Sequence, residues 1–541
     1  MPNETIEGHG GTLAVAAARV HGVETMFTLS GAHVFPLYDA AVKPEPTLRL
    51  VDVRHEPTAV FAAEATGKLT RVPGLAVLTA GPGVTNGVSP ITQAKFAGSP
   101  LVVLGGRSPQ SRWGTGALQE LDHVPILAPV CKLAETVFDV AAISARVDAA
   151  FAAARSSHRG PTFLDVPMDQ LFQWATAAAP GAWRPTPEEP DADALQRIAG
   201  LLATAARPVL VLGTDVWADG AEAQALAFVE ATGIPTITNG MARGVIPGGH
   251  PLLMTKARSA AFKQADLVIV VGTPLDFRLG YGVFGEAAVV HIADSAAQVS
   301  AHANPAASVH GDLGSVFTAL LETSVPDWSA WATTLQEIVA AGAQRDAAAL
   351  SADADPIHPA RIYGELNRRL ADDAVVIGDG GDFVSFAGKY VEPRTPGNWL
   401  DPGPYGCLGA GLGAAIAARI ARPAAQVVAL LGDGAAGMSL MDVDTLVRHN
   451  LPAVLVVGNN SCWGLEKTPM QTMYGYDVAA DLGHETSYDA IVRALGGAGE
   501  TVTRPGDIGP ALDRAFASNV PYLVNVITDQ KAAYPRTTLG V

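Results

Sequence analysis

Short apolar runs, many of them ending at a glycine, recur along almost the whole chain and limit its fold more than any other feature. The runs cover residues 75–80, 101–105, 162–166, 209–213, 267–272, 289–293, 375–378, 427–432, 454–458 and 523–527. Alanine-rich segments of helical length lie between them, such as 58–69, 143–154 and 442–448. Strands that are apolar on both faces and alternate with helices are typical of parallel sheets. We therefore predict an α/β protein of doubly wound parallel-sheet domains.

Two breaks divide the chain. Residues 175–194 (ATAAAPGAWRPTPEEPDADA) are rich in proline, alanine and acid, which predicts a linker. Residues 341–359 are expected to be helical at first and then an alanine-, aspartate- and proline-rich connection. Since domains average roughly 100–200 residues, we predict three of them, at 1–180, 190–345 and 355–541.

Composition excludes several classes of partner and location. Lysine and arginine number 36 against 53 aspartates and glutamates, a net charge of −17 with no basic cluster, which argues against nucleic acid and anionic membranes. The first residues, MPNETIEGHGG, lack the basic and apolar regions of a signal peptide, and no apolar stretch is long enough to span a membrane. The cysteines Cys131, Cys407 and Cys462 have no paired spacing. We expect a soluble, cytoplasmic protein.

The strongest chemical motif is LLGDGAAGMSLMDVDTLVRHNLPAVLVVGNN, residues 430–460. One predicted strand ends at Gly432-Asp433-Gly434, a helix follows, and a second predicted strand ends at Asn459-Asn460. Parallel strands joined by one helical crossover place their carboxyl ends side by side, so Asp433 and Asn460 are expected to converge. A carboxylate, an amide and a main-chain oxygen suit Mg²⁺, and glycine N–H groups can approach a diphosphate. The simpler interpretation is that these are two unrelated turns, each following a strand. The occurrence of both strand ends in this order and at this spacing favours a metal and diphosphate site.

On this motif the chain resembles the thiamin diphosphate (ThDP)-dependent acetolactate synthase, 2-hydroxyacyl-CoA lyase and oxalyl-CoA decarboxylase superfamily, over essentially its whole length. The resemblance implies a ThDP-pyrimidine domain, a central nucleotide-binding-like domain and a ThDP-diphosphate domain, in that order. It implies Mg²⁺ ligation by Asp433, Asn460 and the main-chain oxygen of Cys462. The cofactor-binding residues that it implies on the diphosphate side are Gly381, Asp382, Phe383, Gly432, Asp433, Gly434, Ala435 and Asn460.

A second motif, RHEPTAVFAAEATGKLTRVPGLAVLTAGPGVTN, covers residues 54–86. Glu56 stands where a helix is expected to begin, and an acid there is also favoured by the helix dipole alone. In the family, the glutamate at this position hydrogen-bonds the aminopyrimidine and promotes removal of the proton from C2, a task suited to a buried carboxyl. The loop from Gly81 to Asn86 would lie against the pyrimidine.

The segment WLDPGPYGCLGAGLGAAIAA, residues 399–418, supplies the remaining cofactor contacts by resemblance. Gly406 would offer its carbonyl to the 4′-amino group of ThDP, and Leu408 would support the bent conformation of the cofactor. Leu408 could equally be an apolar core residue.

Three positions bear on the branch of the superfamily. Met168 stands where acetolactate synthases carry a lysine that handles the second keto acid. Glu466, six residues after Asn460, stands where related keto-acid decarboxylases place a proton-handling glutamate, although a surface acid beside Lys467 would look the same. Leu118-Gln119-Glu120 replaces the Tyr-Glu-Glu of oxalyl-CoA decarboxylases.

The stretches VVIGDGGDFVSFAG and WLDPGPYGCLGAGLG, with the Ala-Tyr-Pro-Arg ending at 533–536, are most similar to actinobacterial 2-hydroxyacyl-CoA lyases. This implies cleavage of a 2-hydroxyacyl-CoA to formyl-CoA and an aldehyde or ketone, or the reverse condensation, with Glu56 and Glu466 as catalytic residues. Ala32, His33, Leu118 and Gln119 are expected on the substrate side. Because lyases commonly carry phenylalanine at the Leu118 position, a wider pocket predicts a branched substrate such as 2-hydroxyisobutyryl-CoA.

The central domain resembles the one that holds FAD in synthases and ADP in the CoA enzymes. Arg278 is a candidate to bind a nucleotide phosphate, and Asp294 a candidate to bind a ribose. The alternative, which the sequence supports equally, is that Arg278 is a surface cation and Asp294 a turn residue at the end of a strand. The sequence does not separate ADP, FAD and an empty site, and we rank ADP above FAD. Family architecture places Glu56 against the cofactor of a second subunit, so we expect a homodimer or homotetramer. The expected small-molecule partner is an acyl-CoA substrate.

Two rival functions stay open. An acetolactate synthase that joins two pyruvates would bind FAD and release CO₂, and Met168 and Glu466 argue against it. A catalytically silent, nucleotide-binding assembly protein on the same fold would fail to bind ThDP, and intact Glu56, Asp433 and Asn460 argue against that.

Overall fold

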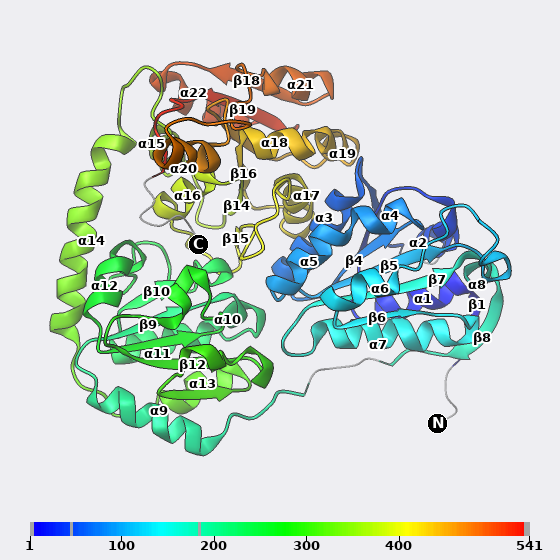
Figure 1. Ribbon diagram of the computed structural model, residues 1–541, viewed down its shortest axis with the longest axis horizontal. Coiled ribbons are helices and arrows are strands. Elements are labelled where there is room, and N and C mark those ends of the chain that lie inside the picture. The colour runs from blue at the N-terminus through cyan, green and yellow to red at the C-terminus, as the bar shows by residue number, and fades with distance from the viewer. Residues whose placement is uncertain (1–4, 44–46, 182–185, 535–541) are drawn as a thin grey trace.

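The computed structural model describes residues 5–43, 47–181 and 186–534, and it contains three parallel sheets with helices on both faces (Figure 1). The predicted fold class is therefore confirmed. Each of the ten predicted runs forms a strand. One sheet lies in each of the ranges 1–180, 190–345 and 355–541, while the boundaries themselves stay predictions.

The N-terminal sheet has the strand order β3-β2-β4-β5-β7-β6. Alternate residues of β4 face opposite cores, since Leu75 and Val77 pack in one cluster and Ala76 and Leu78 in another. Helices α1 (Gly10–Val20), α2 (Phe35–Val42) and α7 (Ile143–Arg155) cover the first face, and α3 (Glu56–Thr70) and α5 (Val88–Phe96) cover the second. The strands are β2 (Thr25–Thr28), β3 (Arg49–Asp52), β4 (Gly74–Leu78), β5 (Leu101–Arg107), β6 (Leu133–Thr136) and β7 (Pro161–Pro167).

The central sheet has the order β10-β9-β11-β12-β13. Leu210 and Leu212 of β9 face α9 (Ala192–Thr204), α11 (Glu222–Thr232) and α13 (Leu313–Leu320), while Val209 and Val211 face α12 (Arg258–Gln264) and α14 (Ser329–Leu350). The strands are β9 (Pro208–Leu212), β10 (Thr236–Thr238), β11 (Leu267–Val271), β12 (Ala288–Ala293) and β13 (Ala307–His310).

The C-terminal sheet has the order β15-β14-β16-β17-β19-β18. Helices α15 (Ala360–Leu366), α16 (Asp382–Tyr390) and α22 (Ile508–Phe516) cover one face, and α17 (Gly411–Ala421), α19 (Val443–Arg448) and α21 (Tyr488–Ala494) the other. The strands are β14 (Val375–Asp379), β15 (Trp399–Leu400), β16 (Val427–Gly432), β17 (Val454–Asn459), β18 (Ala498–Val502) and β19 (Tyr522–Ile527).

The N-terminal and C-terminal sheets share one hydrophobic core through α3 and α17 (Figure 1). The two helices approach closely because α17 carries Gly413 at the contact, where a β-carbon would lie 2.7 Å from Phe61 Cβ and 2.9 Å from the Thr58 carbonyl oxygen. This contact holds the start of α3, and hence Glu56, against the C-terminal unit.

The predicted linker at 175–194 is wrong at its start. Residues Trp174–Ala178 form β8, which pairs antiparallel with β1 (Thr5–His9). The proline- and acid-rich composition begins only at Pro180, and α9 starts two residues before the range ends, with Asp191 capping it by accepting from Ala194 N. Helix α14 also runs past residue 345, to Leu350.

Two further points concern the predicted location and tail. Among the described residues, no helix is long and apolar enough to cross a membrane. Part of the Ala-Tyr-Pro-Arg ending at 533–536 lies outside the described residues.

Candidate functional site

The carboxyl ends of β14, β16 and β17 lie side by side, since Asp379 pairs with Leu431 and Gly432 with Gly458 in parallel register. A small cavity, here called the strand-end cavity, opens at this edge. The structure thus brings together ten of the residues singled out in the sequence, namely Gly381, Asp382, Phe383, Gly432, Asp433, Gly434, Ala435, Asn460, Cys462 and Glu466.

Asp433 is the buried acid of this cavity, with an exposed fraction of 3%. Its Oδ1 accepts a hydrogen bond of 2.9 Å from Gly434 N, whereas its Oδ2 is buried without any hydrogen-bond partner among the described residues. Burial raises the pKa of Asp433 to about 6, against the opposing effect of the Gly434 and Ser461 N–H groups. A buried carboxylate oxygen without a partner is costly unless a cation compensates it.

The neighbouring groups fit a hard cation. Asn460 contributes an amide oxygen, which accepts from Cys462 N at 3.2 Å, and Cys462 itself is buried. Carboxylate, amide and main-chain oxygens form the donor set that Mg²⁺ prefers, with its remaining positions left for water or phosphate oxygens.

Aromatic and aliphatic side chains explain the glycines around the cavity. A β-carbon on Gly434 would lie 2.4 Å from the ring of Trp463, and one on Gly381 would lie 2.4 Å from Leu465 Cδ1. Sequence reasoning missed Trp463 as a residue of the cavity. The sequence feature that could have pointed to Trp463 is its position next to Cys462, a predicted metal ligand. The main-chain N–H of Trp463 donates a hydrogen bond to Ala480 O, which stabilises this turn.

Glu466 lines the cavity from the first turn of α20 (Gly464–Tyr474) and is exposed to solvent. Lys467 does not pair with it, because that lysine contacts Asp477 at 3.1 Å and Asp481 at 2.6 Å. Both interpretations of Glu466 therefore stay open, since it is an exposed helix acid next to Lys467 and also lines the cavity.

Glu56 begins α3 and is buried, with an exposed fraction of 8%. Asn86, at the end of α4 (Pro82–Asn86), donates a hydrogen bond of 3.0 Å to Glu56 Oε2. Beyond Glu56, the hydroxyl of Thr58 donates to Asp442 Oδ2 at 2.6 Å and links α3 to the C-terminal unit. Glu56 is nevertheless absent from the lining of the strand-end cavity of the same chain.

The predicted substrate residues gather at the edge of the N-terminal sheet. His33 follows Ala32 in a short 3₁₀ turn, and its Nδ1 lies 3.2 Å from Thr79 Oγ1. Burial lowers the pKa of His33, while a hydrogen bond with the Leu118 main chain opposes that shift.

Gly81 and Gln119 both have a left-handed backbone there, with φ of +60° and +57°, and a β-carbon on Gly81 would lie 2.9 Å from Gln119 Cβ. Leu118 projects outward, with 75% of its surface exposed.

A buried hydrogen-bond chain that sequence reasoning missed supports this edge. Gly81 N donates to His123 Nε2 at 3.0 Å, so the ring proton lies on Nδ1 and is donated to Asp165 Oδ2 at 2.9 Å. Arg107 donates to the same oxygen at 3.2 Å, and Trp113 stacks over its guanidinium. The available signal was an arginine and an aspartate inside the apolar strands β5 and β7, since buried charges are paired.

The loop with Gly406 and Leu408 is held to the end of β14 by Asp379. This buried carboxylate accepts from Gly409 N at 3.1 Å and Gly411 N at 2.7 Å, and burial raises its pKa to about 6. Gly406 is exposed with φ of +74°, and Leu408 is half-buried rather than a core residue.

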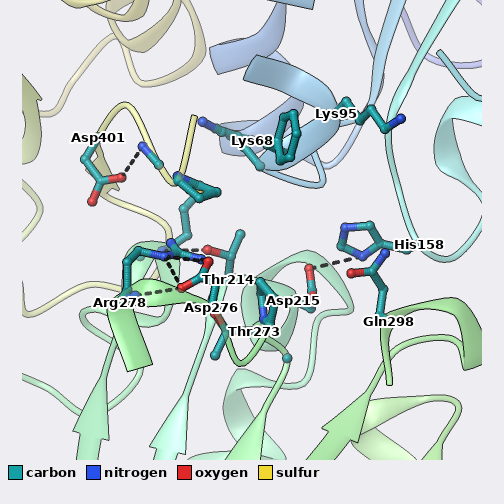
Figure 2. Close-up of a pocket in the computed structure, with 18 residues that line it drawn as sticks. Lys68, Lys95, His158, Thr214, Asp215, Thr273, Asp276, Arg278, Gln298 and Asp401 are labelled. Atoms are coloured by element: carbon teal, nitrogen blue, oxygen red, sulfur yellow. Dashed lines mark hydrogen bonds and ion pairs between the residues drawn. The ribbon is translucent and has the colours of Figure 1, made fainter. Parts of the chain in front are cut away.

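A second, larger cavity of about 350 Å³ lies where all three sheets' units meet, and we call it the interdomain cavity (Figure 2). Lys68 and Lys95 reach it from the N-terminal unit and Arg278 from the central unit, where Asp276 pairs with the guanidinium at 2.7 Å. Asp294 is buried and does not line the cavity; its Oδ2 lies 2.9 Å from His158 Nδ1. The structure therefore brings Arg278 to this cavity but leaves Asp294 outside its lining.

Comparisons with known proteins agree with this architecture. The N-terminal TPP binding domain, the central domain and the C-terminal TPP binding domain of thiamine pyrophosphate enzymes match residues 9–126, 195–320 and 379–526. An acetolactate synthase large subunit of Mycobacterium tuberculosis is 49% identical over 98% of this chain and 97% of its own length. The human 2-hydroxyacyl-CoA lyase 2 is 35% identical over 92% of this chain and 86% of its own length.

Proposed function

This chain belongs to the thiamine pyrophosphate enzyme family, and from that premise we propose that it is a ThDP- and Mg²⁺-dependent lyase that cleaves a 2-hydroxyacyl-CoA. The products would be formyl-CoA and a ketone or aldehyde, and the reverse condensation uses the same groups. The observation that carries this proposal is that Glu466 shares the strand-end cavity with Asp433 and Asn460.

The cofactor assignment rests on the fit of the strand-end cavity. Asp433, Asn460 and the main-chain oxygen of Cys462 would hold Mg²⁺, and Gly432, Gly434 and Ala435 would approach the diphosphate. Bound ThDP supplies an electron sink for the carbon next to the broken bond. Glu56, oriented by Asn86, would hold a proton at the aminopyrimidine nitrogen.

On the substrate side, Glu466 would accept the proton of the 2-hydroxyl group as the bond between C1 and C2 breaks. His33 and Gln119 would orient the thioester end of the substrate. The exposed Leu118 side chain leaves room for a branched acyl group, such as 2-hydroxyisobutyryl.

The interdomain cavity supports a nucleotide. Lys68, Lys95 and Arg278 bring positive charge to its lining, which also contains Asp215, Asp276 and Asp401. Ligand pockets span about 300–1,000 Å³, and a volume of about 350 Å³ favours an ADP-sized group over the larger FAD. We assign the cavity to ADP or the nucleotide end of CoA.

The partner assignment follows from the position of Glu56. Within one chain this acid does not line the strand-end cavity, while Met438 and Met441, which follow the cavity residues 432–435 in the sequence, are 57% and 54% exposed. These observations support a homodimer or homotetramer in which the Glu56 of one subunit serves the cavity of another.

Acetolactate synthase is the second candidate, and the relative at 49% identity favours it. Against it stands Met168, where a synthase would carry lysine. A silent assembly protein is the weakest candidate, since the chain carries Asp433 in the strand-end cavity and a buried Glu56 bonded to Asn86.

A product assay separates these functions. Purified protein with ThDP and Mg²⁺ is offered 2-hydroxyisobutyryl-CoA, a linear 2-hydroxyacyl-CoA and pyruvate in parallel. Formyl-CoA from either thioester supports the lyase. Acetolactate from pyruvate without thioester cleavage replaces it by the synthase, and failure to bind ThDP supports the silent protein.

A further inference from the structure

A cluster of one histidine and two aspartates joins the N-terminal unit to the central unit beside the interdomain cavity. His158 follows α7, Asp215 lies in α10 (Thr214–Ala218) just after β9, and Asp294 follows β12. His158 Nδ1 lies 2.9 Å from Asp294 Oδ2 and 3.6 Å from Asp215 Oδ1. In Figure 2, His158 and Asp215 face each other at the cavity wall.

The two carboxylates are under-partnered for their burial. Asp215 is 5% exposed and, within the described part of the chain, its carboxylate accepts no hydrogen bond. Asp294 is 1% exposed, and its Oδ1 is buried without a described partner. One imidazole N–H satisfies one acceptor, so three of the four carboxylate oxygens lack a good donor.

Two other cations lie near the cluster. Arg159 is shared between Asp219, at 2.7 Å, and Asp294 Oδ2, at 3.8 Å. Lys132 directs its ammonium to Ser156 O and His158 O, each at 2.7 Å. Burial opposes a charged ring, but Asp215 and Asp294 raise the pKa of His158 to about 9, so protonated His158 is the compensating charge when no cation is present.

The geometry suits a metal ion. The three ligand atoms lie within 4.8 Å of one another, and tetrahedral bonds of about 2.1 Å place ligand atoms about 3.4 Å apart. The ring is held in place at its other edge, where Gly98 has φ of +60° and a β-carbon would be 2.6 Å from His158 Nε2. Nitrogen with carboxylate oxygen is a donor set of zinc-class cations, whereas Mg²⁺ and Ca²⁺ prefer oxygen alone.

We infer that His158, Asp215 and Asp294 bind a divalent cation of the zinc class that fastens the N-terminal unit to the central unit. This site is separate from the Mg²⁺ site at Asp433, and it assigns Asp294 to a cation rather than to a ribose. Because His158 and Asp215 line the interdomain cavity, the open coordination position faces it.

The test is a titration of the full-length protein with Zn²⁺ alone after removal of metals by a chelator. An Asp433→Asn background removes the predicted Mg²⁺ site, so that one strong site per chain is expected. His158→Ala and Asp294→Asn should each weaken Zn²⁺ binding by about 100-fold or more, and Co²⁺ should give a visible absorption band that both substitutions abolish.

The matched control is His310→Ala, which removes a histidine of the central unit that lies outside the cluster, 3.2 Å from Glu188, and should leave the affinity unchanged. Asp215→Asn keeps the shape of the side chain, so it alters a proposed ligand with little risk of a folding defect. Circular dichroism checks the fold of each variant. If the Asp433→Asn protein and its His158→Ala derivative bind Zn²⁺ equally, or neither binds it, the cluster is an ion triad and the inference is overturned.

Discussion

The three carboxylates of the proposed site differ in burial and in their partners, and those differences separate their chemistry. Asp433 is buried, and one of its carboxylate oxygens has no hydrogen-bond partner among the described residues. This suits a metal ligand, because a bound cation would compensate the buried negative charge. Glu466 is exposed and free of Lys467, which suits a group that exchanges protons with substrate and water. Glu56 is buried but tied to Asn86, which suits a group of fixed orientation.

The first prediction concerns Glu466. Glu466→Gln should lower kcat for the substrate that the product assay identifies by about 100-fold, because proton transfer at the substrate is lost. Exchange of the C2 proton of bound ThDP, followed by NMR after acid quench, should be largely retained. Glu56→Gln is the contrast, since it should lose both activities. Full turnover by Glu466→Gln would remove this residue from the mechanism.

The second prediction concerns His123, which has no exposed surface. His123→Leu leaves the Gly81 N–H without its acceptor and removes one donor from Asp165, which should cost about 2–5 kcal/mol in the free energy of unfolding. Since Gly81 touches Gln119, kcat should fall as well.

Urea unfolding and steady-state kinetics measure both effects. His21→Leu is the matched control, because it breaks a histidine–carboxylate contact of 2.8 Å with Asp148 away from the site, so it should lower stability without changing kcat. A His123→Leu protein with the stability and kcat of the wild type would contradict the prediction.

Residues in a contiguous motif could be predicted, and residues in a three-dimensional network could not. Asp433 and Asn460 were predictable because one crossover connects their strands. His123, Asp165 and Arg107 lie on three separate segments and meet only in the fold. Asp294 shows the reverse case, in which a strand-end acid suggested a nucleotide contact, while in the structure it faces His158.

At the scale of elements, all ten predicted strands are inner strands of the three sheets, and β2 is the one inner strand of these sheets that was not predicted. The parallel strands that the apolar runs did not reveal in the described chain are β2 and the edge strands β3, β6, β10, β13, β15 and β18. Edge strands have a neighbour on one side only, so they are shorter and more polar, as in Arg49–Asp52. The ribbon of β1 and β8 was missed for the same reason, because both of its strands are edges.

The third prediction concerns the junction of β14 and the Gly406–Leu408 loop. Burial raises the pKa of Asp379 from 3.8 to about 6, so the folded protein binds this proton more tightly than the unfolded chain. The stabilising effect of that proton is complete at low pH and is lost as pH rises through about 6, a total of about 3 kcal/mol at most.

Asp379→Asn should therefore gain stability relative to the wild type as pH rises from about 4 to 7. Urea unfolding of both proteins across this range measures the difference. Glu365→Gln is the control of opposite sign, because its arginine neighbours lower the pKa of Glu365 despite its burial. A difference between Asp379→Asn and wild type that does not change with pH would contradict the argument.

At the scale of the whole molecule, two of the three units share a large apolar core, and the third joins them through both apolar and charged contacts. The N-terminal and C-terminal sheets are joined by α3 and α17 in one apolar cluster. The central unit adds Met241 to this cluster, and it also meets the other units through charged groups, including the Arg71–Glu222 pair at 2.8 Å and the His158 cluster. The nucleotide and the cation proposed above both lie at the junction of the central unit, so each would stabilise its attachment.

The last prediction tests whether a working site needs two chains. Glu56→Gln and Asp433→Asn should each be inactive alone. If the Glu56 of one subunit serves the strand-end cavity of its partner, a mixed dimer has one site with both defects and one intact site. Random pairing of equal amounts of the two variants should then restore about one quarter of wild-type activity per site.

Co-expression with two different affinity tags, followed by two-step purification, isolates the mixed dimer, which should have about half of the wild-type activity. The control pairs Asp433→Asn with Asn460→Ala, which damage the same cavity and should not complement each other. If the active site were built within one chain, every site in the first mixture would carry one defect and no activity would return. Recovery therefore depends on exchange of Glu56 between subunits, which the absence of Glu56 from the lining of its own chain's cavity leads us to expect.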